Sequence, residues 1–193
     1  MSKIVLLFGL LLYFSTTYAQ HLSFMGIQLG QDEKIFVQSI KAKGFKFKKK
    51  VPLGDVYEGD FWKLMDCELF YFQGSNLATG FNYIESVHII ATKQNVPEVS
   101  PTLYKQLVSN MDSKYGKHYN VTDYISTYTS GYLWIKHGGY IVTQLDDGLE
   151  GLTISIDYLD NSCHTAKEAK ENFRKKERKP ARPLKPRNYN ADL

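Results

Sequence analysis

Apolar residues in the first half of the chain follow a helical spacing and then a strand spacing. Ile35, Phe36 and Ile40 share one face of a helix that we expect over residues 32–43. Gly44 is suited to the left-handed conformation that ends many helices. The segments after it alternate between apolar and polar residues. We expect strands over residues 55–62, 65–72 and 81–91, with a short extra strand over 45–51.

The second half shows the same order of elements. Ser100 has the side chain of a helix N-cap, and Pro101 suits the first helical position. Apolar residues recur at every fourth position from Leu103 to Tyr115, and Gly116 ends the predicted helix. In the last segment, apolar and polar residues alternate, which is typical of a strand with one buried face. We expect strands over residues 119–129, 132–137, 140–145 and 152–159.

These patterns predict an α+β fold made of two tandem helix-plus-antiparallel-sheet repeats. The helices do not alternate with the strands, which argues against parallel βαβ units. We expect both helices on one face of the sheet, so that the opposite face remains partly open. The predicted organisation is a signal peptide over residues 1–19, a first repeat over 20–96, a second repeat over 97–163 and a basic, Pro-containing tail over 164–193.

Short motifs flank both predicted helices. They are Gly26-Ile27-x-Leu29-Gly30, Lys43-Gly44-Phe45 and Lys114-Tyr115-Gly116-Lys117. With them, residues 24–159 resemble the β-lactamase-inhibitor-protein fold, in which two tandem units present a concave sheet. They also resemble the single unit of small outer-membrane assembly lipoproteins, and similar openings occur in uncharacterised secreted proteins of Bacteroidetes-type bacteria. The resemblance implies this fold and favours protein binding, and it assigns no individual contact residue.

The N-terminus has the pattern of a secretory signal peptide. Lys3 precedes an uninterrupted apolar run over residues 4–14, and a short small and polar segment ends at Ala19. The run is shorter than the ~20 residues that span a bilayer, and no later stretch could span one. We therefore expect cleavage after Ala19 and a mature bacterial protein that is periplasmic or secreted, without a transmembrane segment.

The C-terminal tail differs in charge from the rest of the chain. Residues 164–193 contain ten Lys+Arg and four Asp+Glu, whereas residues 20–163 carry a net charge of −3. Pro180, Pro183 and Pro186 favour an extended form, so we expect a disordered tail. This tail is either only solvated or attaches a structural envelope factor to an anionic surface. Nucleic acid is disfavoured as a partner, because the basic runs lack interleaved aromatic residues.

The composition is that of an ordinary globular protein, with 43% apolar and 23% charged residues, but it is rich in aromatic rings at 14%. Several rings alternate with the aliphatic core positions of the predicted strands. If the aliphatic set faces the helices, the rings line the open sheet face; otherwise both faces are covered and the rings belong to the core. The first reading predicts a protein partner, with an envelope glycan second, bound through Tyr124, Tyr128, Tyr132, Trp134 and Tyr140.

The sequence offers little support for catalysis, and we lean toward a protein that is not an enzyme. No metal-ligand spacing, serine-nucleophile motif or phosphate-binding loop is present, and we expect no cofactor and no metal. The alternative is a hydrolase with an unrecognised site near His88 or His137. Cys67 and Cys163 either form a disulfide that joins the halves or remain two separate thiols.

Overall fold

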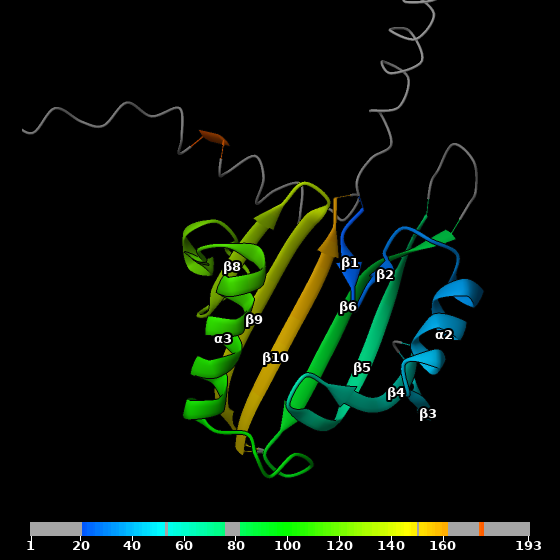
Figure 1. Cartoon of the computed structure of the whole chain (residues 1–193), viewed down its shortest axis with the longest axis horizontal. Helices are drawn as coiled ribbons and strands as arrows, with labels where there is room; N and C mark the ends of the chain where they lie inside the picture. The colour runs from blue at the N-terminus through cyan, green and yellow to red at the C-terminus, as the bar shows by residue number, and fades with distance from the viewer. Residues whose placement is uncertain (1–20, 53, 76–81, 150, 162–173, 176–193) are drawn as a thin grey trace, which may run out of the picture.

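The computed structural model describes residues 21–52, 54–75, 82–149, 151–161 and 174–175. It shows a mixed α+β fold, as the sequence predicts, with a large antiparallel sheet accompanied by helices (Figure 1). The predicted signal peptide, Cys163 and the basic tail apart from residues 174–175 lie outside the described residues. Among the helices of the described ranges, none combines the length and the apolar character needed to cross a membrane.

Eight strands form the main sheet in the order β3-β4-β5-β6-β10-β9-β8-β7. Strands β6 and β10 pair in the middle, and three strands lie on either side of this central pair. The outermost strands are β3 and β7. The strands are β3 (Lys46–Val51), β4 (Gly54–Phe61), β5 (Leu64–Ser75), β6 (Asn82–Thr92), β7 (Tyr119–Asn120), β8 (Tyr132–Lys136), β9 (Gly139–Gly148) and β10 (Gly151–Asp160).

Helix α2 (Glu33–Ala42) precedes the first four strands. The Asp32 side chain caps it by accepting a hydrogen bond from the Lys34 amide over 2.8 Å. Its buried residues are Phe36 and Ile40, as the helical spacing predicts, whereas Ile35, which was expected on the same face, is 53% exposed. Gly44, with a φ of 98°, ends the helix in the left-handed conformation.

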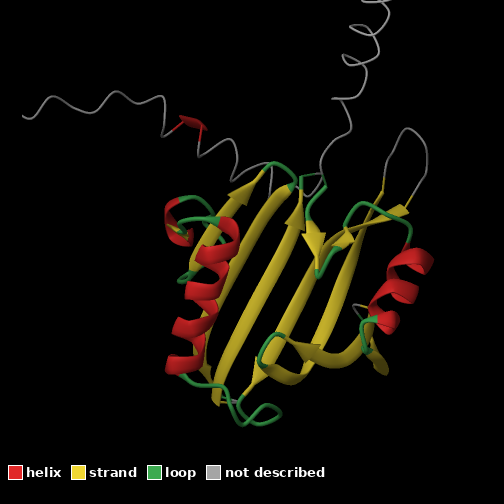
Figure 2. Cartoon of the chain, in the orientation of Figure 1, coloured by secondary structure: helices red, strands yellow, loops and turns green. Residues whose placement is uncertain are grey.

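Helix α3 (Pro101–Tyr115) precedes the last four strands. The Ser100 hydroxyl accepts a hydrogen bond from the Leu103 amide over 3.2 Å, which confirms the predicted N-cap. Leu107 and Met111 are buried in the same cluster as the buried residues of α2. Figure 2 shows both helices in front of the sheet in this view.

A small hairpin, which the sequence did not predict, lies between the two helices in Figure 1. It pairs β1 (Ser23–Phe24) with β2 (Ile27–Gln28). The Phe24 ring stacks on Phe61 at 5.7 Å and meets Tyr158 edge-on at 5.3 Å. The hairpin therefore adds its own apolar residues to the core on the helix side of the sheet.

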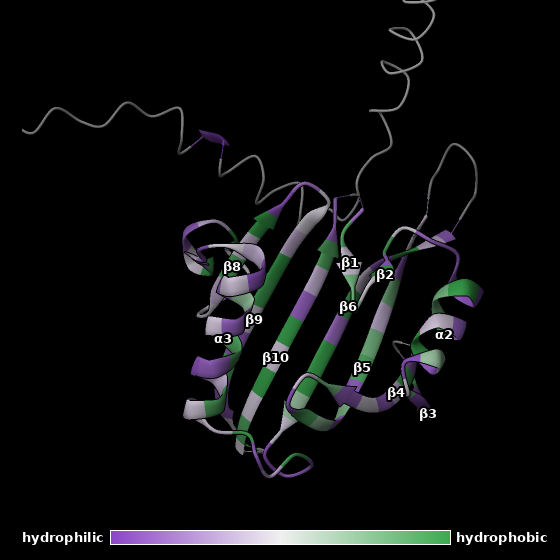
Figure 3. Ribbon diagram, in the orientation of Figure 1, coloured by the Kyte–Doolittle hydropathy of each residue, from purple (hydrophilic) through white to green (hydrophobic). Residues whose placement is uncertain are grey.

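The two faces of the sheet are buried by different parts of the chain. On the helix side, Ile156 of β10 lies beside Ile89 of β6, and both belong to the larger hydrophobic cluster. A second cluster on the other side includes Leu133 and Val142 together with Val121 and Ile125. Figure 3 shows the alternation of apolar and polar residues along the central strands that produces these two faces.

The segment over residues 121–128, which we call the covering segment, corrects one predicted element. The sequence predicts a strand over 119–129, but strand β7 ends at Asn120 and a 3-10 turn follows at Val121–Asp123. The Asn120 side chain caps this turn by accepting from the Thr122 amide over 3.3 Å. The chain then folds over the sheet instead of extending it, because Val121 and Ile125 are buried against β8 and β9.

The outer strand β3 is dominated by lysine. Its sequence is KFKKKV, and every residue before Val51 is exposed. Lys48 forms ion pairs with Glu58 and Glu68, and Lys49 lies 3.4 Å from Glu68. The strand thus carries a strongly cationic outer edge, held against two carboxylates of its neighbours.

Candidate functional site

The five aromatic residues predicted to bind a partner do not share an open face. Trp134 is 1% exposed and packs in the cluster on the helix side, where Tyr132 is partly buried. Tyr140 is 0% exposed and belongs to the cluster on the other side, against which Tyr124 and Tyr128 of the covering segment pack. The expectation of one exposed ring-bearing face is wrong, because this part of the sheet is covered on both sides.

One of these residues, Tyr132, instead forms part of a row of three rings. Its ring lies 6.1 Å from that of Tyr104 of α3 in a nearly parallel arrangement, with 21° between the planes. On its other side, the His118 ring is centred 4.3 Å away. Rings held in this way present a rigid surface to a ligand at little cost in conformational entropy.

Asp112, near the end of α3, fixes the histidine at one end of the row. Its carboxylate lies 3.0 Å from His118 Nδ1 and also accepts a hydrogen bond from the Trp134 indole over 3.1 Å. The His118 amide donates to the same carboxylate over 3.1 Å. A single carboxylate therefore connects the helix, the start of β7 and strand β8 beneath the ring row.

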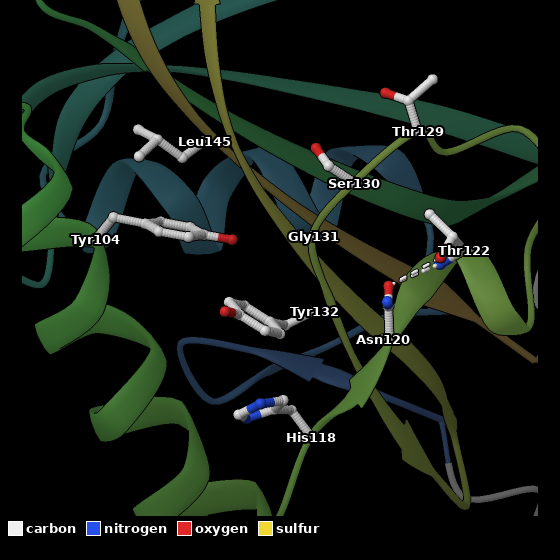
Figure 4. Close-up of a pocket in the computed structure, with 9 residues that line it drawn as sticks. All are labelled: Tyr104, His118, Asn120, Thr122, Thr129, Ser130, Gly131, Tyr132 and Leu145. Carbon is white, nitrogen blue, oxygen red and sulfur yellow. Dashed lines mark hydrogen bonds between the residues drawn. The ribbon is translucent and has the colours of Figure 1, made fainter.

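The ring row forms one wall of a cavity of about 670 Å³, which we call the ring-walled pocket. Figure 4 shows the three rings along one side and the polar side chains of the 120–130 region along the other. Cavities of this size accommodate small molecules or single units of a polymer. The lining residues are Tyr104, His118, Asn120, Thr122, Thr129, Ser130, Gly131, Tyr132 and Leu145.

A glycine and a side-chain hydrogen bond hold the polar wall close to the sheet. Gly131 has a φ of 115°, and a Cβ atom there would lie 2.2 Å from the carbonyl oxygen of Thr143. Only glycine fits this conformation and this close approach. The Gln144 amide donates to the Ser130 carbonyl over 2.9 Å. Strand β9 therefore fixes the position of the pocket wall.

The groups that face the pocket are aromatic rings and neutral polar side chains. Burial raises the pKa of the Tyr104 hydroxyl to about 12, so this hydroxyl stays protonated at neutral pH. It is hydrogen-bonded to Thr143 over 3.0 Å. What faces the cavity is therefore a set of ring surfaces opposite neutral hydroxyl and amide groups, which can stack on a ligand and hydrogen-bond to it.

A different polar cluster lies on the side of the sheet away from the helices, around His88. His88 Nδ1 lies 2.6 Å from Asp157 Oδ1 across the central strand pair, and His88 Nε2 lies 3.2 Å from the Ser86 hydroxyl. The Tyr128 hydroxyl donates to Asp157 Oδ2 over 2.9 Å. His88 stands out in the sequence, but its partner Asp157 does not, because only the pairing of β6 with β10 brings the two together; Ser86, two residues before His88, matters only once that pairing is known.

His137, the other histidine singled out by the sequence analysis, is exposed at the turn between β8 and β9. Its carbonyl group accepts a hydrogen bond from the Asn161 side chain. Among the residues that the structure describes, no group of three or more His, Cys, Asp or Glu side chains could hold a metal ion.

Cys67 is a free thiol buried on the helix side of the sheet. Its Sγ donates to the Gly59 carbonyl over 3.0 Å, and burial raises its pKa to about 12. A thiol with this pKa is protonated at neutral pH and is a poor nucleophile. Cys163, with which the sequence left a disulfide possible, lies outside the described ranges.

Comparison of the chain with models of protein families, with curated proteins and with solved structures found no match.

Proposed function

We propose that this protein is an exported binding module and that its ligand is a segment of an envelope glycan held in the ring-walled pocket. The observation that carries the proposal is the row of rings formed by Tyr104, Tyr132 and His118 opposite neutral polar side chains. A sugar ring has an apolar face that stacks on aromatic rings and hydroxyl groups that bond to Asn, Ser and Thr side chains.

The shape of the pocket favours a glycan over the protein partner that the sequence analysis placed first. A protein partner needs a contact surface of about 800 Å² on each side. The large rings expected to supply such a surface, Trp134 and Tyr140, are buried. The cavity of about 670 Å³ suits a small unit that enters it.

Binding can be tested with the mature chain, residues 20–193, and a panel of soluble muropeptides and neutral oligosaccharides. Trp134 lies 5.9 Å from the His118 ring, so its fluorescence reports on a ligand that contacts the ring row. We expect a saturable fluorescence change with at least one saccharide, which Tyr132→Ala weakens at least tenfold. The matched control is Tyr119→Ala, since Tyr119 is an exposed ring outside the lining residues. Equal loss in both variants, or no saccharide bound, would refute the proposal.

We also infer that the protein is made of two tandem repeats with the β-lactamase-inhibitor-like order. Support comes from the order of the elements, since one helix precedes β3 to β6 and another precedes β7 to β10. The strand order is mirrored about the β6–β10 pair. The inference is tested by determining an experimental structure and superposing its first half on its second half. It fails if the two halves do not superpose as one helix followed by four strands.

Export is proposed from the sequence pattern of residues 1–19. Mass spectrometry of the protein from a bacterial periplasm or culture medium should find a mature N-terminus at Gln20. Attachment to anionic surfaces through the basic tail remains a prediction, since nearly all of that tail lies outside the described residues. It requires salt-sensitive binding to anionic vesicles that is lost when the chain is truncated after Cys163.

A further inference from the structure

Three polar residues meet at the centre of the sheet on the side away from the helices. Ser86 and His88 are two positions apart on β6 and therefore project from the same face. Asp157 of β10 lies directly opposite His88 in the strand register, so its side chain shares that face as well. The arrangement is built into a central strand pair, where main-chain hydrogen bonds hold both backbones.

The hydrogen bonds run in one line from the hydroxyl to the carboxylate. The Ser86 hydroxyl lies 3.2 Å from His88 Nε2, and His88 Nδ1 lies 2.6 Å from Asp157 Oδ1. With the histidine proton on Nδ1, the imidazole donates to the carboxylate and accepts from the serine. This is the order of contacts that activates a serine nucleophile in hydrolases of unrelated folds.

The carboxylate is itself held in place. The Tyr128 hydroxyl of the covering segment donates to its second oxygen, Oδ2, over 2.9 Å. Asp157 is 8% exposed, so its side chain has little room to adopt another rotamer. It fixes the orientation of the His88 ring, and we regard it as a positioning residue.

Apolar side chains surround the serine. Phe72 of β5 and Leu159 of β10 lie directly across from Ser86 in the strand register. The Phe72 ring is 37% exposed and packs edge-on against the His88 ring at 5.0 Å. Ser86 is 5% exposed. A reagent that reaches its hydroxyl therefore contacts an apolar surface, which suits an apolar acyl group.

We propose that Ser86 is a reactive nucleophile that accepts an acyl group from esters of apolar carboxylic acids, with His88 as its base. The Ser86 oxygen forms a bond to the ester carbonyl carbon while its proton passes to His88 Nε2. The bond from that carbon to the alcohol oxygen breaks, and the departing alcohol takes the proton from His88. Water then attacks the acyl-serine by the same route, which releases the acid and restores the Ser86 hydroxyl.

The sheet limits the second half of this reaction. Ser86 lies on a central strand that pairs with β5 on one side and β10 on the other. Ser86 itself is registered with both neighbours, beside a shift in the β5–β6 register, and it does not lie at a helix N-terminus of the kind that supplies N–H groups to an oxyanion. We expect acylation of Ser86 to be detected as a stoichiometric event and turnover to be slow.

The first experiment treats the mature wild-type chain with a fluorophosphonate probe and maps the adduct by peptide mass spectrometry. The Ser86 oxygen displaces fluoride from phosphorus, so a stable covalent product forms. We expect one adduct per chain, on Ser86. An adduct that is absent, or that is spread over several serines, would overturn the proposal without any need for a variant.

Variants then separate chemistry from structure. His88→Gln should slow labelling about 100-fold, within the range for removal of a general base, and Ser86→Ala should abolish it. Phe72→Ala should speed labelling, because it opens the approach to Ser86. The matched control is Ser155→Ala, which removes a serine from the same face but opposite Ile90 instead of a histidine, and it should label normally. Normal labelling of His88→Gln would count against the site.

Asp157→Asn tests the positioning role through the pH profile of labelling. The titratable groups facing His88 are Asp157 from β10, Tyr128 from the covering segment, and Glu68 of β5, which lies opposite Ile90. In the wild type, the rate should rise with pH, because only the neutral imidazole can take the serine proton. Asp157→Asn should shift this rise, whereas a purely structural role would leave the profile in place. Because this site faces away from the ring-walled pocket, its failure would not affect the proposed glycan binding.

Discussion

Trp134 and Asp112 are joined by a hydrogen bond of 3.1 Å that runs from the buried indole of β8 to a carboxylate near the end of α3. The indole has this partner although it is 1% exposed, which fits the rule that buried polar groups are hydrogen-bonded. The same carboxylate holds His118 at the ring row. The buried Trp134 and the His118 end of the ring row therefore depend on a single acidic side chain.

Asp112→Ala should lower both stability and ligand binding. It leaves the Trp134 N–H without its acceptor, which costs about 1–3 kcal/mol, and it frees the His118 ring. Urea denaturation followed by tryptophan fluorescence measures the first effect. Asp112→Asn is the control, because its amide oxygen can still accept from the indole, so its loss of stability should be smaller. Equal losses in the two variants would argue against the hydrogen bond as the cause.

Gly131→Ala should destabilise the protein by more than about 1 kcal/mol and narrow the pocket. The new Cβ would lie 2.2 Å from the Thr143 carbonyl, at a φ of 115° that side chains rarely adopt. Gly148→Ala is the matched control on the same hairpin, where nothing lies within 4 Å of the added Cβ. In thermal unfolding, Gly131→Ala should melt at a clearly lower temperature than Gly148→Ala. Similar melting temperatures would show that the pocket wall can shift at little cost in free energy.

Cys67 should be inert in the folded protein. Its thiol is 0% exposed, and burial raises its pKa to about 12. In a Cys163→Ser background, a thiol reagent such as DTNB at pH 8 should react with Cys67 only after urea is added. In the wild type, two thiols should react in urea, because Cys67 is a free thiol, and the absence of any reaction would mean that Cys67 is bonded to Cys163. Rapid reaction of the native variant would contradict the buried position.

Stability should fall in the alkaline range. The pKa of Cys67 rises from 9.0 to about 12 and that of Tyr104 from 10.0 to about 12, in both cases chiefly through burial. Below about pH 8, both groups are protonated in the folded and the unfolded chain alike. At higher pH the unfolded chain releases protons that the folded chain retains, so the free energy of unfolding decreases as the pH rises toward 12. Cys67→Ala should show a shallower decrease than the wild type between pH 8 and 11, and an unchanged slope would exclude the thiol as a source.

The sequence predicts the elements better than it predicts what covers them. Ser100 and Asp32 mark the helix starts, and the alternation from Ile154 to Tyr158 identifies a strand with one face in the core. These features are local. The same alternation does not say which face meets the helices, and Val121 and Ile125 fit a strand as well as they fit the covering segment.

The polar sites were harder to predict because they depend on strand register. Ser86 and His88 are close in sequence, but Asp157 is 69 residues away from His88, and only the pairing of β6 with β10 places it there. In the ring-walled pocket, Tyr104 and Tyr132 come from a helix and a strand whose spacing is set by the packed core. No short motif contains either group, so a search for motifs in the sequence could not find them.

Strand β3 has a consequence for how this protein behaves in concentrated solution. An unpaired strand edge invites the same edge of another molecule to extend the sheet, and repeated extension leads to fibres. Two copies that met through β3 would bring the like-charged ammonium groups of exposed lysines such as Lys46 and Lys50 close to one another. The resulting repulsion opposes edge-to-edge association of sheets through β3 and helps to keep the protein from forming fibres.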